Sequence, residues 1–177
     1  MIIGDFFFEI PRSLPVLEVL SPYYIVFVLV CFLLSRVFKA KIRPVALLLA
    51  NIFFLYSFSL YHLACMCELA LIGYLLSLLM LFRNNRKTLA ISVFCCIVVL
   101  CLFKYQGLWD YSATVPLGLS YVSFKLISYY ADLNNGKTAG TKNLIYFLDY
   151  ALFFPVLTAG PINRFQPFFD DIKHPGN

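Results

Sequence analysis

Three ionisable side chains lie inside long apolar runs of this 177-residue chain: Glu68, Lys125 and Asp149. A charged group at the centre of a membrane helix costs roughly 3 kcal/mol, so each needs a partner or a polar cavity. Glu68 either faces other helices or the nearby membrane interface, or lines a hydrophilic cavity. Groups of this kind mark ion, proton or substrate pathways when they gather in one place.

Lys125 lies in the middle of its apolar run and shares a helical face with other polar side chains. If residues 116–133 form a helix, this face carries Tyr121, Lys125 and Ser128, with Ser120 and Phe124 beside them. A polar stripe along a membrane helix indicates a face turned toward a water-filled or substrate-filled cavity. The alternative is an ion pair of Lys125 with Asp132 or Asp149 inside the bundle.

A third stretch, residues 153–165, combines helix breakers with a guanidinium group. Pro155, Gly160 and Pro161 interrupt regular helix within a few residues, and Arg164 follows at once. Broken backbone at membrane depth is tolerated where it is buried in protein or lines a cavity, and arginine binds carboxylates and phosphates with a planar fork. The alternative is that the helix ends here and Arg164 marks the interface.

The amino-acid composition indicates that these segments face lipid rather than water. The chain is 62% hydrophobic and 13% charged, where soluble domains are near half apolar and a quarter charged. This excludes a soluble domain, a disordered chain and a disulfide-stapled secreted module. The six cysteines lie in apolar runs without a histidine or cysteine partner at metal-finger spacing, so we predict small buried hydrophobes and no metal site. The net charge of +5 is explained by membrane topology, and we predict no nucleic-acid partner.

We therefore predict an all-α, multi-pass membrane bundle with about five or six apolar segments in a single domain, residues 1–177. The predicted parts are an interfacial segment at 1–21, then spans at about 22–38, 44–60, 63–82, 88–103, 116–133 and 144–158, and a turn with a polar tail at 159–177. A short loop holding Tyr61 and His62 is expected between the second and third spans.

Basic residues alternate with these spans and give an orientation. One cluster comprises Arg36, Lys39, Lys41 and Arg43, a second comprises Arg83, Arg86 and Lys87, and a third comprises Lys137 and Lys142. Basic loops face the cytoplasm, and the clusters are two crossings apart, as alternation requires. We predict a bacterial cytoplasmic-membrane protein with an extracytoplasmic N-terminus.

Three motifs in this order resemble those of the membrane-bound O-acyltransferase family. The first is residues 103–105 (FKY), the second is 116–125 (PLGLSYVSFK) followed by Tyr129 and Asp132, and the third is 153–155 (FFP) with 159–165 (AGPINRF). Within the family, the chain is similar both to alginate-type polysaccharide O-acetyltransferases and to the D-alanyl-transfer enzymes of teichoic acid.

The resemblance implies a funnel of mostly tilted helices across which an acyl group is transferred. A cytoplasmic thioester, acyl-CoA or an acyl carrier protein, is the implied donor, and an extracytoplasmic polysaccharide or teichoic acid hydroxyl is the acceptor; no bound cofactor is expected. The residues expected to line the funnel are Ser120, Tyr121, Lys125, Gly160, Pro161 and Arg164.

The chain departs from the family at the catalytic base. The family's histidine lies beyond the third motif on a later membrane helix, whereas this sequence holds only His62 and His174. We therefore assign no catalytic residue and expect the N-terminal part of a longer or split enzyme, inactive alone, whose incomplete funnel exposes Lys125 and Asp149 to lipid. A non-catalytic membrane subunit that docks a partner is the alternative, and a small transporter is the third.

Overall fold

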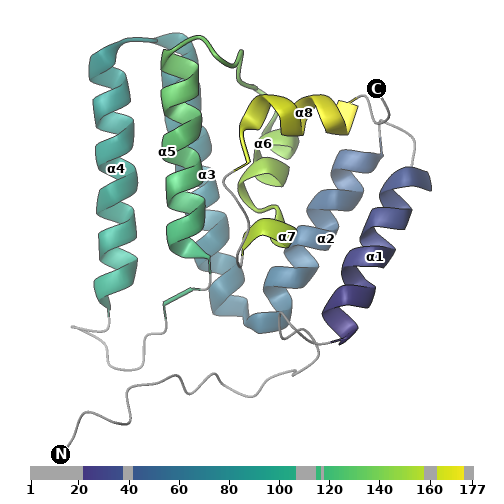
Figure 1. The fold of residues 1–177 in the computed structure, drawn as a ribbon. Helices are drawn as coiled ribbons and strands as arrows, with labels where there is room; N and C mark the ends of the chain where they lie inside the picture. The colour runs from purple at the N-terminus through teal and green to yellow at the C-terminus, as the bar shows by residue number, and fades with distance from the viewer. Residues whose placement is uncertain (1–21, 38–41, 107–114, 117, 158–162, 174–177) are drawn as a thin grey trace, which may run out of the picture.

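The computed structural model describes residues 22–37, 42–106, 115–116, 118–157 and 163–173. These residues form helices joined by turns, with no strand among them, so the all-α prediction is confirmed for this part of the chain (Figure 1). The helices are α1 (Pro22–Val37), α2 (Arg43–Phe58), α3 (Leu60–Phe82), α4 (Arg86–Tyr105), α5 (Leu119–Asn134), α6 (Leu144–Ala151), α7 (Phe154–Leu157) and α8 (Phe165–Lys173).

Side-chain caps fix where three of the helices begin. The Ser59 hydroxyl accepts hydrogen bonds from the backbone N–H groups of Tyr61 and His62, Asn85 caps α4 and Asn143 caps α6 in the same way. Such caps satisfy the orphan donors of a first helical turn. The predicted loop at Tyr61 and His62 is therefore wrong, because the Ser59 cap starts α3 at Leu60 and places both residues in its first turn.

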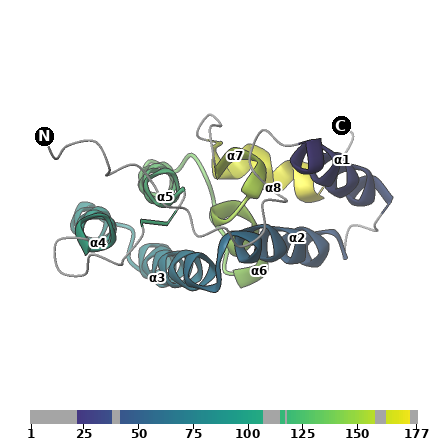
Figure 2. The same ribbon diagram turned by 90° about the horizontal axis from the view of Figure 1, so that it is seen from below.

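The helices pack as a curved row with a second layer on one side. Helices α1 to α4 follow one another along the row, while α5 packs against α3 and α4, and α6 packs against α2 and α3 (Figure 2). Helix α8 lies across the end of the bundle above α6 and α2 in Figure 1. Helices α6 and α7 meet at a break, so the predicted single segment at 144–158 is two short helices.

The connections that carry basic residues gather at one end of the bundle. The α3–α4 and α5–α6 turns lie at the top of Figure 1, together with the start of α2 and all of α8. The start of α3 and the end of α4 lie at the opposite end. This is the arrangement that alternating basic clusters require, while the side of a membrane that each end faces stays a prediction.

Two helices are long and apolar enough to cross a membrane, α3 with 23 residues and α4 with 20. Large apolar side chains project outward from both of them, including Leu75 on α3 and Phe94 on α4. Outward apolar faces suit a protein surrounded by lipid rather than water. The number of spans, five or six, stays a prediction, because α1 and α2 have 16 residues each.

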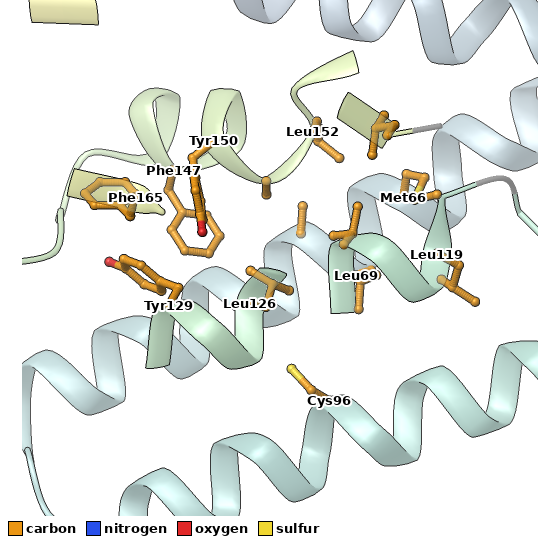
Figure 3. Packing of buried hydrophobic residues seen from close by; sticks show 14 of the residues in the cluster. Met66, Leu69, Cys96, Leu119, Leu126, Tyr129, Phe147, Tyr150, Leu152 and Phe165 are labelled. Carbon is orange, nitrogen blue, oxygen red and sulfur yellow. The ribbon is translucent and has the colours of Figure 1, made fainter. Parts of the chain in front are cut away.

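The core lies between the row and the second layer. Phe147 and Tyr150 of α6 pack with Tyr129 of α5 and Phe165 of α8, next to Leu126 (Figure 3). The ring centroids of Phe165 lie 4.9 Å from Tyr129 and 5.1 Å from Tyr150. Aromatic side chains supply much apolar area and prefer tilted or edge-on contacts of this kind. The core therefore joins α5, α6 and α8 into one unit.

Within the turn and polar tail predicted at 159–177, residues 165–173 form α8. Its apolar residues follow helical spacing, so that Phe165 and Ile172 are buried, with Phe168 and Phe169 partly buried. The acids Asp170 and Asp171 occupy the outward face. An amphipathic helix is stabilised by packing its apolar stripe, whatever its polar content. The interfacial segment predicted at 1–21 lies outside the described residues.

Candidate functional site

The second and third sequence motifs meet in space where α5 begins. Gly118 precedes α5 with a φ of +80°, a conformation in which an L side chain is strained. A Cβ atom at Gly118 would also lie 3.1 Å from the carbonyl oxygen of Leu157, at the end of α7. The glycine of the second motif thus allows its backbone to approach Leu157, which lies between the two parts of the third motif.

Lys125 of α5 is 0% exposed and points into the protein, not into an open cavity. Its ammonium group donates a hydrogen bond to the backbone carbonyl of Tyr150. The same nitrogen lies 4.4 Å from the ring centroid of Tyr150, 5.8 Å from that of Tyr121 and 5.9 Å from that of Phe168. Ring faces attract cations, so three aromatic side chains and one carbonyl surround this lysine.

The alternative considered for Lys125, an ion pair with Asp132 or Asp149, is absent from the described residues. Within the described ranges, neither Asp132 nor Asp149 pairs with it, and its polar partner is the Tyr150 carbonyl. The expectation that Lys125 and Asp149 are exposed to lipid is wrong, since both side chains are 0% exposed. Tyr150 of α6 and Phe168 of α8 cover Lys125, while Asp149 of α6 contacts Asn51 of α2.

Tyr150 connects the two motifs and was missed in the sequence. Its hydroxyl lies 3.1 Å from the carbonyl oxygen of Asn163 and 3.4 Å from that of Lys125, and it can donate its proton to either. Asn163 directly precedes Arg164, so one tyrosine links α5, α6 and the start of α8. The signal was weak: a tyrosine in an apolar run needs a partner for its hydroxyl when buried.

The other residues predicted to line the funnel are distributed around this cluster. Ser120 is exposed on α5 and Arg164 is exposed just before α8, while Tyr121 of α5 is half-buried. Gly160 and Pro161 lie outside the described residues. The structure thus brings Tyr121, Lys125 and the neighbour of Arg164 together, and their role in a funnel stays a prediction.

A second buried polar cluster lies at the break between α6 and α7. The side-chain amide of Asn51, on α2, donates to Oδ1 of Asp149 at 3.3 Å, and its oxygen accepts from the backbone N–H of Phe154 at 3.1 Å. The second carboxyl oxygen of Asp149, Oδ2, is buried and has no hydrogen-bond partner among the described residues. Asn51 thus satisfies an N–H group freed by the helix break.

Helix α8 is fixed to the bundle by polar contacts at both of its ends. The guanidinium of Arg43, at the start of α2, donates to the Ile172 carbonyl at 3.2 Å, near the end of α8. The Thr138 hydroxyl donates to Oε1 of Gln166 at 3.0 Å. These contacts fix the helix that directly follows Arg164.

The histidines do not join this site where the structure describes them. His62 lies at the opposite end of the bundle, stacked on Phe58, with Nδ1 3.4 Å from the Ser59 hydroxyl. His174 lies outside the described residues. Among the residues described, no three His, Cys, Asp or Glu side chains gather as metal ligands. The described part of the chain thus offers a fixed cation and a surface arginine, but no histidine base.

Two helices long and apolar enough to cross a membrane, together with a buried lysine and a buried acid, fit the class of helical membrane proteins with polar groups in their interior. Part of the chain is similar to members of the membrane-bound O-acyltransferase family, as the motifs predicted. It is 42% identical to the probable alginate O-acetylase AlgI of Pseudomonas aeruginosa over 60 residues, 34% of this chain and 12% of that protein.

Two further relatives support this similarity. The probable alginate O-acetylase AlgI of Pseudomonas fluorescens is 37% identical over 76 residues, 41% of this chain and 15% of that protein. The teichoic acid D-alanyltransferase of Lacticaseibacillus rhamnosus is 26% identical over 91 residues, 50% of this chain and 22% of that protein. The matched segments therefore span less than a quarter of each relative. No protein-family model and no solved structure matches the chain.

Proposed function

We propose that the chain is the N-terminal part of a membrane-bound O-acyltransferase of the bacterial cytoplasmic membrane. It helps to transfer an acetyl or D-alanyl group from a cytoplasmic thioester to a hydroxyl of an extracytoplasmic polysaccharide or teichoic acid. The observation that carries this proposal is the meeting of the two motif stretches through Gly118 and Tyr150. The names of the relatives, an alginate O-acetylase and a teichoic acid D-alanyltransferase, support the reaction class.

In this proposal the two cationic residues have different roles. Arg164 is exposed at the basic end of the bundle, where its planar fork can bind a phosphate or carboxylate of the donor or its carrier. Lys125 is held in place by Tyr150 and does not reach the surface. Its fixed positive charge would favour the negative charge that develops on the thioester carbonyl oxygen when a hydroxyl attacks it.

The attack also needs a base to accept the hydroxyl proton while the thiolate leaves. His62 lies at the wrong end of the bundle for a residue of this cluster. We propose that a histidine from further membrane helices, in a longer chain or a partner subunit, supplies this base. The chain alone is then expected to bind the donor or the partner without turnover.

The test begins with the nucleotide sequence that follows the codon for Asn177. If a reading frame there adds membrane helices with a histidine, the complete protein is assayed in membranes with labelled acetyl-CoA or a D-alanyl carrier protein. Arg164→Gln is expected to raise the KM for the donor, and Lys125→Met to lower kcat. Lys104→Gln, at the other end of the bundle, is the matched control. Absence of acyl transfer, or wild-type kinetics in both variants, contradicts the proposal.

A second candidate function is a non-catalytic membrane subunit that binds a partner. The full burial of Lys125 and Asp149 favours it, because the described helices enclose these groups without help from another chain. It predicts that the chain is stable and monodisperse by itself and co-purifies with a separate acyltransferase. A transporter is less well supported, since Glu68 is exposed on α3 while Lys125 and Asp149 are buried, so the three do not line one surface.

A further inference from the structure

Two neighbouring turns form a basic surface that the acyl-transfer proposal does not use. The Asn84 side-chain amide, between α3 and α4, donates to the Leu133 carbonyl at 3.4 Å, and the Tyr74 hydroxyl of α3 donates to the Lys142 carbonyl at 2.6 Å. These contacts hold the α3–α4 turn against the end of α5, and the α5–α6 turn against α3 (Figure 1). Together the turns carry five exposed cations, here called the basic rim: Arg83, Arg86, Lys87, Lys137 and Lys142.

The positive charge of the basic rim is not neutralised within the described part of the protein. None of the five cations forms an ion pair with a described carboxylate, and Lys142 packs over the Phe82 ring at 5.4 Å instead. The first turn of α4 holds Arg86 and Lys87 and no acid. Like charges that lie close together repel one another. A counter-charge from outside the described helices would therefore stabilise this end of the bundle.

The surroundings of the basic rim indicate what carries that counter-charge. Phe82, at the end of α3, is 75% exposed, and Leu79 and Leu144 beside the same turns are exposed as well. A ligand that covers both the basic rim and these exposed apolar side chains has an anionic head and an apolar body. Clusters of four to eight Lys and Arg at the end of membrane helices are typical of anionic lipid binding.

We propose that the basic rim binds the phosphate headgroup of an anionic phospholipid, whose acyl chains cover Phe82, Leu79 and Leu144. This requires only a bilayer around the bundle and does not depend on acyl transfer. A soluble acidic protein would neutralise the cations of the basic rim, but would leave Phe82, Leu79 and Leu144 uncovered. One lipid molecule neutralises the basic rim with its headgroup and covers the apolar side chains with its acyl chains.

The test compares the full chain in detergent with added phosphatidylglycerol or phosphatidylcholine, measuring lipid retention by native mass spectrometry and the thermal midpoint. Phosphatidylglycerol is expected to be retained and to raise the midpoint. Each cation near an anionic surface strengthens binding about fivefold, so the triple variant Arg83→Gln, Arg86→Gln, Lys87→Gln should bind roughly a hundredfold more weakly. Lys104→Gln, an exposed cation at the other end of α4, is the matched control and should bind like the wild type.

Four results with lipids and phosphate would overturn the proposal, and so would a fifth, with a carrier protein. The four are equal retention of both lipids, undiminished phosphatidylglycerol binding by the triple variant, an equal loss in Lys104→Gln, and the same stabilisation by inorganic phosphate alone. The last result would define a simple anion site. An acidic acyl carrier protein that binds without lipid, and displaces phosphatidylglycerol through the same three cations, would replace the lipid with a protein partner. A midpoint of the triple variant in phosphatidylcholine that is no lower than that of the wild type verifies that it remains folded.

Discussion

The substitution Asn51→Asp tests whether the amide at the helix break stabilises the bundle. Asn51 donates to Asp149 and accepts from the Phe154 N–H. An aspartate of the same shape keeps the acceptor but removes the donor, and places two carboxyl groups face to face. No cavity is created, so the change isolates the polar interaction.

The expected cost follows from the contacts that are lost. A hydrogen bond to a charged or strongly polar group contributes about 1.5–3 kcal/mol, and leaving a buried partner unsatisfied costs a similar amount. Polar pairs in membrane bundles often contribute less, about 0.6 kcal/mol on average. Because both groups are buried and bridge a helix break, we expect about 2–3 kcal/mol. At roughly 2–4 °C per kcal/mol for a chain of this size, the thermal midpoint should fall by about 4–12 °C.

The exchange variant Asn51→Asp with Asp149→Asn gives the decisive comparison. Here the new carboxylate at position 51 accepts from the Phe154 N–H and from the new amide at position 149, so the pair is restored with its members reversed. We expect at least half of the lost stability to return, measured by circular dichroism during heating in detergent. Asn135→Asp, on an exposed helix cap, is the control and should change little. If the exchange variant unfolds at the same temperature as Asn51→Asp, the two side chains are not coupled and the reasoning fails.

Three further predictions concern the lysine cluster and two glycines. Lys125→Met keeps the length of the buried stem and removes its charge, so the thermal midpoint should stay within a few degrees while acyl transfer by a complete enzyme falls; a large loss of stability would make Lys125 structural. Tyr150→Phe removes only the hydroxyl, so unfolding titrations should show a loss of about 0.5–1.5 kcal/mol, and an unchanged value would mean that its bonds to Asn163 and Lys125 contribute nothing. Gly136→Ala and Gly140→Ala both place alanine at a φ of +67°, but only the second Cβ meets other atoms, at 2.7 and 2.9 Å. Strain alone predicts about 1–2 kcal/mol at both, and crowding adds about 1–3 kcal/mol at Gly140, so equal losses would contradict this packing.

The helical class and most helix positions could be predicted because apolar runs and basic turns alternate along the chain. The missed helix, α8, shows the limit of that signal. The charges of Asp170, Asp171 and Lys173 predict a polar tail over residues 165–173, although Phe165 and Ile172 lie on one helical face. The charged residues show only which side of such a helix faces outward. The spacing of the apolar residues shows which side packs against the bundle.

The site was harder to predict because a sequence shows which side chains share a face but not which way the face turns. Tyr121 and Lys125 do share one, yet the lysine is buried because α6 and α8 cover it. The sequence does not single out Tyr150 and Asn51, because neither carries a charge, and only charged groups mark an apolar run as energetically unfavourable in a membrane. Their importance arises from partners 13 to 103 residues away, such as Phe154 for Asn51, and only the fold supplies those.

The contact between Arg43 and Ile172 joins residues 129 positions apart in the chain. During synthesis the start of α2 is completed long before the end of α8, so the arginine must wait for its carbonyl acceptor while the intervening helices form and pack. Closure of this end of the bundle is therefore a late event in biogenesis. Until α8 docks, this hydrogen bond cannot form, so the start of α2 and the end of α8 are not yet joined through it.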